Sequence, residues 1–391
     1  MTPFESRSRS SRQPSATWTA SVVIAVLCAP ATHVHAQASG ASPTASSQVA
    51  TLIHDLGLVE SPTPVRDRKG WRPPRKVIVW AIYPELVPAL KQAAPSVEFV
   101  PVRDAAEAVA KAADADAVFG LCTPEILAAG PRIRWVQWYF AGVERCVSVP
   151  GMRSRDVLLT NMQRVAGPVM AEHVIAMMLA FARGLQFYIP EHAAARWTED
   201  LPSPDRLLTL QGKTVLVVGL GGIGTEVARR AHALGMNVVA TRTSGRGGPD
   251  FVSHVGTPDE LPRLAGEADF IVNTTPLTAA TTGLFDARFF AAASKGAYFF
   301  NVGRGRSVVQ DDLVAALRGG QIAGAGLDVT DPEPLPADHA LWKLPNVIIT
   351  PHISAESDAG PAARLAIVQE NLRRYVAGDR MLSVVDLDKG Y

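Results

Sequence analysis

Residues 214–224 read TVLVVGLGGIG, a run of five strand-forming residues that leads directly into a glycine-rich turn. A strand inside a parallel sheet has this composition because helices cover both of its faces. The residues that follow, 225–234, carry apolar positions at helical spacing. The segment therefore predicts a strand, a tight turn and a helix in direct succession.

The glycines of this turn follow the pattern GxGxxG, which is typical of sites that bind a dinucleotide. Gly219 permits the tight turn, Gly221 lets the backbone approach a pyrophosphate, and Gly224 lets helix and strand pack closely. The first turn of the helix, around Gly222 and Ile223, would present unpaired N–H groups to the phosphates. The alternative is a plain glycine turn, but the strand before the motif and the helix after it favour a dinucleotide site.

The same alternation of strands and helices extends in both directions along the chain. Downstream, strands are expected at 237–242, 270–275, 297–302, 322–329 and 346–350. Upstream, strands are expected at 76–82, 97–102, 115–121, 133–140 and 157–160, with helices over 84–94 and 105–113. A long helix is expected from Pro168 to about Arg183, and residues 185–210, with three prolines, break the pattern. The sequence therefore predicts two α/β domains, each a doubly wound parallel sheet, and 391 residues are enough for both.

Composition excludes several classes of partner. The 38 Lys and Arg residues nearly cancel the 37 Asp and Glu residues, and no basic stripe interleaved with aromatic residues follows the chain, so no nucleic acid is expected. Cys28, Cys122 and Cys146 allow at most one disulfide and lack metal-ligand spacing, so no metal site is expected. No segment is long and apolar enough to span a bilayer, so no membrane partner is expected either.

Residues 1–36 have the pattern of a secretory signal peptide. Three arginines precede an apolar run over 20–29, and Ala36 ends a small-residue cleavage site. On this basis we expect an exported, periplasmic protein. The alternative is a disordered extension of a cytoplasmic protein, which the cytosolic location of dinucleotide cofactors favours.

Residues 37–75 are expected to form an N-terminal leader rich in Ser, Ala and Pro. Within it, Val49, Leu52, Ile53 and Leu56 are spaced as on one face of a helix. A short helix that packs on the body of the protein is therefore expected here.

Polar residues follow the last three strands, at the edge where open α/β sheets place their ligands. They are Arg304, Glu333 and His352, one after each strand. Taken singly, each has an ordinary alternative: a surface arginine, a loop carboxylate and a histidine satisfied by local hydrogen bonds. Together, after a dinucleotide motif, they predict a catalytic triad.

The end of the second strand of the glycine-motif domain indicates which dinucleotide is used. Sites for NAD usually place an acidic residue about 20 residues past the glycines, to bind the ribose 2′-hydroxyl. Here that position is Arg242, followed by Thr243 and Ser244. A cation and hydroxyls match a 2′-phosphate, so NADP is the preferred cofactor. The alternative is an arginine that stacks on adenine, which leaves NAD possible.

In combination these residues resemble the D-isomer-specific 2-hydroxyacid dehydrogenases, a family that includes glyoxylate/hydroxypyruvate reductases. The resemblance covers about residues 76–391 and rests on an ordered set of motifs. They are Trp135-Val136-Gln137, Ala141-Gly142-Val143, Thr160-Asn161, Ala171-Glu172-His173, the glycine motif, Thr274 to Thr278, Arg304-Gly305, Glu333-Pro334 and Asn346 to His352.

The family implies a particular organisation of the two domains. A Rossmann cofactor domain over 184–353 would be inserted into a flavodoxin-like substrate domain formed by 76–183 and 354–391. The resemblance also implies a homodimer, joined largely through 185–210 and the preceding helix.

The chemistry that the resemblance implies is hydride transfer between NAD(P)H and a small 2-oxoacid or D-2-hydroxyacid. His352 would be the general acid and base, Glu333 would orient it and favour its charged form, and Arg304 would bind the substrate. The expected further contacts to the substrate are Ala141, Gly142 and Val143, and those to the cofactor include Thr275, Pro276, Val302, Gly303 and Asp328.

Other functions remain open at this stage. A non-catalytic protein that senses the dinucleotide, as in corepressors of this family, has the same scaffold, but the intact triad favours an enzyme. Phosphoglycerate and formate dehydrogenases are nearer alternatives, and Glu333 counts against formate because loss of hydride from formate needs no general acid. Two departures from the family, Arg164 in place of a common glycine and the aromatic run 138–140, fall beside the substrate motifs. The sequence does not name the 2-oxoacid.

Overall fold

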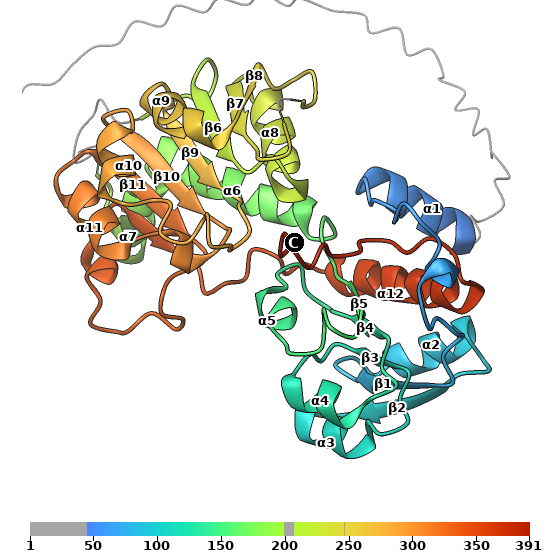
Figure 1. Cartoon of the computed structure of the whole chain (residues 1–391). Helices are drawn as coiled ribbons and strands as arrows, with labels where there is room; N and C mark the ends of the chain where they lie inside the picture. The colour runs from blue at the N-terminus through green and yellow to red at the C-terminus, as the bar shows by residue number, and fades with distance from the viewer. Residues whose placement is uncertain (1–44, 199–206, 246) are drawn as a thin grey trace, which may run out of the picture. The chain divides into compact units, whose positions relative to one another are not determined.

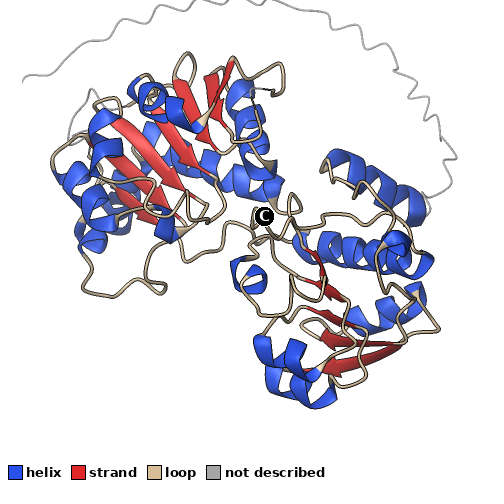
Figure 2. Ribbon diagram, viewed as in Figure 1, coloured by secondary structure: helices blue, strands red, loops and turns tan. Residues whose placement is uncertain are grey.

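The computed structural model describes residues 45–198, 207–245 and 247–391 (Figure 1). The predicted signal peptide, residues 1–36, and the first residues of the leader lie outside this part of the chain. The described residues build two parallel β-sheets, and helices cover both faces of each sheet (Figure 2). This confirms the predicted α/β architecture with two doubly wound sheets.

The first sheet has five strands in the order β2-β1-β3-β4-β5, which is the flavodoxin-like order. The strands are β1 (Lys76–Trp80), β2 (Glu98–Val102), β3 (Ala117–Phe119), β4 (Trp135–Gln137) and β5 (Leu158–Thr160). One face is covered by α1 (Ala45–Asp55), α2 (Leu86–Ala93) and α12 (Gly360–Ala377), and the other by α3 (Ala105–Lys111), α4 (Pro124–Ala129) and α5 (Glu144–Val147). The leader helix that the sequence predicts is α1, and its Leu52 and Ile53, together with Leu56 directly after it, pack on this core.

A network of hydrogen bonds between buried polar side chains joins β4, β5 and α12. The Thr160 hydroxyl donates to Oε1 of Gln137 at 2.8 Å and accepts from Nε1 of Trp135 at 2.8 Å. Asn371 of α12 donates to the same Gln137 oxygen at 3.0 Å. All four side chains are fully buried, where an unpaired polar group would be costly. The C-terminal helix is therefore an integral part of the first sheet's core.

The second sheet has seven strands in the order β12-β11-β10-β9-β6-β7-β8. The order is that of a Rossmann sheet with one additional strand at the β12 edge. The strands are β6 (Thr214–Val218), β7 (Asn237–Thr241), β8 (His254–Gly256), β9 (Phe270–Asn273), β10 (Ala297–Asn301), β11 (Ile322–Leu327) and β12 (Val347–Ile349). One face carries α6 (Gly167–Ala182) and α8 (Gly222–Ala233), and the other α9 (Leu261–Gly266), α10 (Ala287–Ala292) and α11 (Gln310–Arg318).

Helix α6 is apolar around most of its circumference because it lies inside the molecule. Met170, Met177 and Met178 are buried in the core beneath the second sheet, together with Phe181. Phe181 packs edge-on against Phe300 of β10 at a centroid distance of 5.9 Å. The helix expected from Pro168 to about Arg183 is therefore present, and its methionines are core residues.

The structure differs from the sequence prediction in several places. Residues 185–210 are predicted as a break, but they begin with a helix, α7 (Leu185–Ala193), that contains Pro190. Gly184, with a left-handed φ of 67°, redirects the chain between α6 and α7, so a change of direction occurs here without loss of helix. The three-residue edge strand β8 is not predicted, and the strands are mostly shorter than predicted. Short 3-10 helices complete the fold: η1 (Val65–Asp67), η3 (Pro258–Glu260), η4 (Gly305–Ser307) and η5 (Ala340–Lys343).

Within the described ranges, no single helix has the length and apolarity to cross a membrane. Helices α6 and α7 reach both limits only when taken together, as a pair bent by 76°. Cys122 and Cys146 are free and buried in the core of the first sheet, so the one possible disulfide is not formed between them. Cys28 lies outside the described residues.

Candidate active site

The glycine motif forms a tight turn in front of α8. The first helical hydrogen bond runs from Thr225 N–H to Gly221 O at 2.9 Å, so the N–H groups of the three preceding residues have no acceptor in the helix. Gly219 has a left-handed φ of 97°, and a Cβ on Gly224 would lie 2.2 Å from the carbonyl oxygen of Gly219. A Cβ on Gly221 would meet nothing within 4 Å. The turn thus offers free N–H groups and open space, which fits a pyrophosphate.

Arg164 lies against this turn. Its φ of 71° is in the left-handed region, which a glycine adopts without strain. A Cβ on Gly222 would lie 2.5 Å from Cγ of Arg164, and one on Gly57 would lie 3.4 Å from its Nη1. The departure noted in the sequence therefore places a guanidinium group between the leader and the start of α8.

Arg242 lies at the end of β7, directly beside the glycine turn. The N–H groups of Gly219 and Leu220 both donate to the carbonyl oxygen of Thr241 at 3.0 Å. The Arg242 guanidinium donates to Oγ of Ser244 at 2.8 Å and to the carbonyl oxygen of Gly247 at 2.9 Å. The structure thus places Arg242, Thr243 and Ser244, which are predicted to bind the 2′-phosphate, in the loop next to the glycine turn.

The hydroxyl group of Tyr391 lies 3.4 Å from Oγ1 of the neighbouring Thr243. This contact joins the loop after β7 to a residue 148 positions further along the chain. No sequence pattern indicates it.

Asn273 organises the loops that follow β9 and β10. Its side chain is fully buried and donates to Oδ1 of Asn301 at 2.9 Å and to Oγ of Ser307 at 2.8 Å. Its own Oδ1 accepts from the N–H of Thr275 at 3.0 Å and from the Thr275 hydroxyl at 2.7 Å. Sequence reasoning missed Asn273, although its place at the end of a buried strand was a signal.

The predicted cofactor residues of these loops differ in whether their side chains reach the surface or the core. Gly303 packs closely on the Thr275-Pro276 turn, because a Cβ there would lie 2.8 Å from the carbonyl oxygen of Thr275. The side chain of Val302, by contrast, is 1% exposed and belongs to the core. Only its main chain reaches this surface, so a cofactor contact by the Val302 side chain is not what the structure shows.

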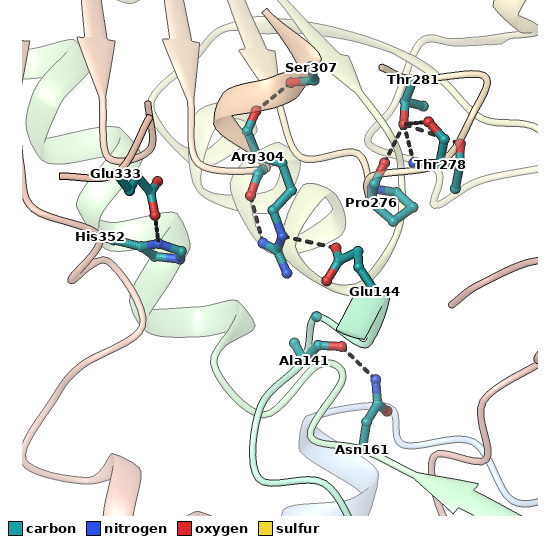
Figure 3. Close-up of polar contacts among 12 residues, drawn as sticks. Ala141, Glu144, Asn161, Pro276, Thr278, Thr281, Arg304, Ser307, Glu333 and His352 are labelled. Atoms are coloured by element: carbon teal, nitrogen blue, oxygen red, sulfur yellow. Dashed lines mark hydrogen bonds and ion pairs between the residues drawn. The ribbon is translucent and has the colours of Figure 1, made fainter. Parts of the chain in front are cut away.

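His352 and Glu333 form a hydrogen-bonded pair. Nδ1 of His352 lies 2.9 Å from Oε2 of Glu333, and both side chains reach solvent (Figure 3). A carboxylate can only accept, so Nδ1 carries a proton and donates it. The other carboxylate oxygen accepts from the N–H of Thr330 at 3.1 Å. The ring is therefore oriented, and Nε2 remains for another partner.

The backbone of His352 has a left-handed φ of 55°, which is uncommon for a residue other than glycine. The turn is held by Asp328, whose carboxylate accepts from the N–H groups of Ile353 at 2.9 Å and Ser354 at 3.0 Å. The N–H of His352 donates to the Asp328 carbonyl oxygen at 2.8 Å. Asp328 is predicted as a cofactor contact, but its side chain is only 1% exposed and is committed to this turn.

Burial raises the pKa of Asp328, but hydrogen bonds from Ser354, Thr350 and the Ile353 main chain outweigh it, and the net pKa is lowered. The Thr350 hydroxyl donates to Oδ1 of Asp328 at 2.7 Å. Because that proton is used, Nε2 of His173 must donate to Thr350, at 3.0 Å. His173 of α6 thus supports the turn that carries His352.

The Arg304 side chain contacts Glu144, at the start of α5, and Gly303, in the loop after β10 (Figure 3). Its Nε donates to Oε1 of Glu144 at 2.9 Å, and its Nη1 donates to the carbonyl oxygen of Gly303 at 2.7 Å. A Cβ on Gly142 would lie 1.5 Å from Nη2 of Arg304, so the guanidinium group rests directly on that glycine. Sequence reasoning missed Glu144, which stands two residues after Gly142.

A hydrogen bond from a buried side chain fixes the loop that precedes Glu144. Nδ2 of the buried Asn161 donates to the carbonyl oxygen of Ala141 at 2.7 Å. Val143 is 2% exposed and packs in the core, so its side chain does not face the site as Ala141 and Gly142 do.

A cavity of about 320 Å³ joins these groups. Its lining includes Ala141, Gly142, Ile223, Arg304 and His352, which come from both halves of the chain. Glu333 is not part of the lining and acts on the cavity only through His352.

A proton donor and a guanidinium group thus share one cavity with the first turn of a dinucleotide-binding helix. This combination defines the class as NAD(P)-dependent oxidoreductase. Residues 175–354 match the family model described as "D-isomer specific 2-hydroxyacid dehydrogenase, NAD binding domain". The chain belongs to the D-isomer-specific 2-hydroxyacid dehydrogenase family, as its motifs predict.

Relatives and solved structures agree with this assignment. The chain is 33% identical over 264 residues to the glyoxylate reductase/hydroxypyruvate reductase of Homo sapiens, which spans 66% of this chain and 79% of the human protein. A D-isomer specific 2-hydroxyacid dehydrogenase family protein from Aeromonas salmonicida has a TM-score of 0.70 and 31% identity, covering 80% of this chain and 99% of its own. An NADPH-dependent glyoxylate/hydroxypyruvate reductase from Sinorhizobium meliloti, solved with NADP and sulfate, has a TM-score of 0.68 and 30% identity, covering 81% and 100%.

Proposed function

We propose that this protein reduces a 2-oxoacid to the corresponding D-2-hydroxyacid with NADPH, and that His352 is its general acid. The observation that carries the proposal is the convergence of His352, already paired with Glu333, and Arg304 on one cavity next to the glycine turn. When bound, the cofactor supplies the hydride to the carbonyl carbon. The remaining steps fall to side chains of this chain.

Arg304 would bind the substrate carboxylate and polarise the carbonyl group. Glu144 holds its Nε and the carbonyl oxygen of Gly303 accepts from Nη1, so Nη2 would be the main donor to the substrate. Main-chain N–H groups at Ala141, Gly142 and Val143 would bind the same carboxylate from the opposite loop. These contacts explain why the cavity is lined from both halves of the chain.

His352 would donate its Nε2 proton to the carbonyl oxygen as negative charge develops there. Glu333 accepts from Nδ1 at 2.9 Å, so it keeps the ring in one orientation and stabilises the charged imidazolium. In the oxidative direction the same nitrogen would accept the proton from the hydroxyl group.

The preference for NADP rests on Arg242, with Thr243 and Ser244. They would bind the 2′-phosphate beside the glycine turn, where an NAD site would bring a carboxylate that repels it. The relative from Sinorhizobium meliloti is described as NADPH-dependent and holds NADP, which supports the proposal.

Oxidation of NADPH and NADH, followed at 340 nm on a panel of 2-oxoacids, tests the function. We expect turnover with NADPH and a D-2-hydroxyacid as product, which chiral chromatography identifies. Tight binding of NADPH without turnover on any 2-oxoacid would contradict the proposal and favour a dinucleotide sensor.

We also propose that the protein is a homodimer joined largely through residues 185–210, which begin with α7, and through the preceding helix, α6. Ile189 is 64% exposed and Trp197 94% exposed, and such apolar exposure near one helix is typical of an interface. Light scattering on the purified protein measures the mass, and a monomer at micromolar concentration would contradict this assembly.

Residues 1–36 are proposed to direct export and to be removed. N-terminal sequencing of the protein from its native host tests this, and an uncleaved chain in the cytosol would contradict it.

A further inference from the structure

The cavity beside Arg304 and His352 is larger than a small 2-oxoacid requires. Its volume of about 320 Å³ lies within the range of pockets that hold whole small molecules. Glyoxylate carries only a hydrogen atom on its carbonyl carbon, and hydroxypyruvate carries one hydroxymethyl group. Neither carries an apolar group that would contact the apolar part of the lining.

The leader helix α1 supplies one wall. Leu52 of α1 and Leu56, directly after the helix, line the cavity, while Ile53 of α1 packs on the core of the first sheet and does not line it. These leucines precede β1, so this wall lies outside the two doubly wound sheets. It is a feature of the leader and not of the catalytic motifs.

The loop after β4 supplies an aromatic wall. Phe140 lines the cavity and is 43% exposed, although it is a large apolar side chain. Trp138 meets Phe140 edge-on at a centroid distance of 5.3 Å and donates from Nε1 to the carbonyl oxygen of Gly142 at 2.8 Å. The aromatic run is therefore fixed to the glycine on which Arg304 rests. Met162 and Val165 extend the same apolar lining.

The other charges of the lining are already compensated. Arg364 pairs with Glu356 at 3.2 Å, and its guanidinium carbon lies 6.0 Å from the centre of the Tyr83 ring. A second carboxylate or a phosphate on the substrate would have to compete with Glu356 for this cation. Apart from Arg304 and His352, the lining thus favours an uncharged group.

From this geometry we propose that the substrates are 2-oxoacids with a large apolar side chain, aryl or branched alkyl, which lies against Leu52, Leu56 and Phe140. The inference rests on the proposed 2-oxoacid reduction and names its substrate class. Arg304 and His352 act on the carboxylate and carbonyl end, and the leader and the aromatic run hold the other end. A pocket gains about 10- to 200-fold in kcat/KM for each methylene group it accommodates.

Steady-state kinetics at saturating NADPH test the proposal, with phenylpyruvate and 4-methyl-2-oxopentanoate compared with glyoxylate and hydroxypyruvate. We expect kcat/KM for the apolar substrates to exceed that for glyoxylate by at least about tenfold. The double variant Leu52→Ala, Leu56→Ala should lose about tenfold or more of that preference, with kcat/KM for glyoxylate and KM for NADPH changed less than about twofold.

Ile53→Ala is the matched control, because it shortens an aliphatic side chain on the same helix without changing the lining. It should keep the preference of the unmodified protein. A wild-type preference for glyoxylate, or a preference unchanged in the double variant, would overturn the proposal. An equal loss on all substrates together with a raised KM for NADPH would also overturn it, by assigning the space to the cofactor. Absence of turnover on every 2-oxoacid would instead contradict the proposed function itself.

Discussion

Glu333 accepts a hydrogen bond from Nδ1 of His352 at 2.9 Å, across 19 residues of sequence that connect two neighbouring strand ends. Both side chains are partly exposed, so the pair adds little to stability. Its value is orientation, because the backbone of His352 is already held in a left-handed turn by Asp328. Side chain and main chain are thus fixed by two different carboxylates.

Glu333→Gln should lower kcat by at least about tenfold, because an amide can keep the hydrogen bond but does not stabilise the charged ring that general acid catalysis requires. Steady-state kinetics on the best 2-oxoacid measure the effect, with KM for NADPH as the control. A kcat within a factor of about two of wild type would show that the charge of Glu333 has no part in proton transfer.

Gly142→Ala should lower kcat/KM by about a hundredfold, since a Cβ 1.5 Å from Nη2 forces Arg304 away from the substrate. The melting temperature should stay close to that of wild type. In an Arg304→Ala background the same change should have little further effect, which a double-mutant cycle measures. Additive losses would mean that Gly142 acts independently of Arg304.

Arg242→Asp should lower or reverse the preference for NADPH over NADH, because it replaces the cation beside the glycine turn with a carboxylate that repels a 2′-phosphate. The measurement is the ratio of the two kcat/KM values, with the 2-oxoacid fixed and saturating. A wild-type enzyme that prefers NADH, or a ratio that Arg242→Asp leaves unchanged, would refute the assignment.

Asp328→Asn should make thermal stability less dependent on pH in the acidic range. The pKa of Asp328 is lowered in the folded protein, so its stabilising contribution is complete above the pKa of an unfolded aspartate, about 3.9, and is lost as pH falls through the folded value. Wild type should therefore lose more of its melting temperature between about pH 4 and about pH 2 than the variant does. Asp250→Asn, at an exposed position, is the control and should behave like wild type. Equal slopes in wild type and Asp328→Asn would contradict the role of the carboxylate in the turn.

The sequence predicts the two sheets and the glycine turn because their signals are local. Apolar runs mark buried strands, and the close packing of Gly224 on Gly219 follows from six consecutive residues. Helix α7 is missed because Pro190 reads as a break, although Gly184 alone redirects the chain. Local signals do not show on which side of a strand end a side chain lies, so the sequence did not indicate that the side chains of Val302 and Asp328 are buried. The cofactor contacts at these two residues stay predictions.

Contacts between distant segments are the part that the sequence does not predict. Arg304 and Glu144 are 160 residues apart, and no spacing rule joins them. The leader wall formed by Leu52 and Leu56 depends on how α1 packs against the first sheet, which its amphipathic spacing does not specify. Arg304, Glu333 and His352 were predicted because each follows a strand, whereas Glu144, Asn273 and His173, which hold the surrounding loops and side chains, were not.

The central claim is that His352 donates the proton during reduction of a 2-oxoacid, and His352→Asn tests it most directly. Single-turnover oxidation of enzyme-bound NADPH by the best 2-oxoacid should slow by about 10²- to 10⁴-fold, since that is what general acid catalysis contributes. The Kd for NADPH, measured by fluorescence titration, should stay within about twofold of wild type, because His352 is proposed to contribute through proton transfer rather than cofactor binding. A single-turnover rate near that of wild type would contradict the account.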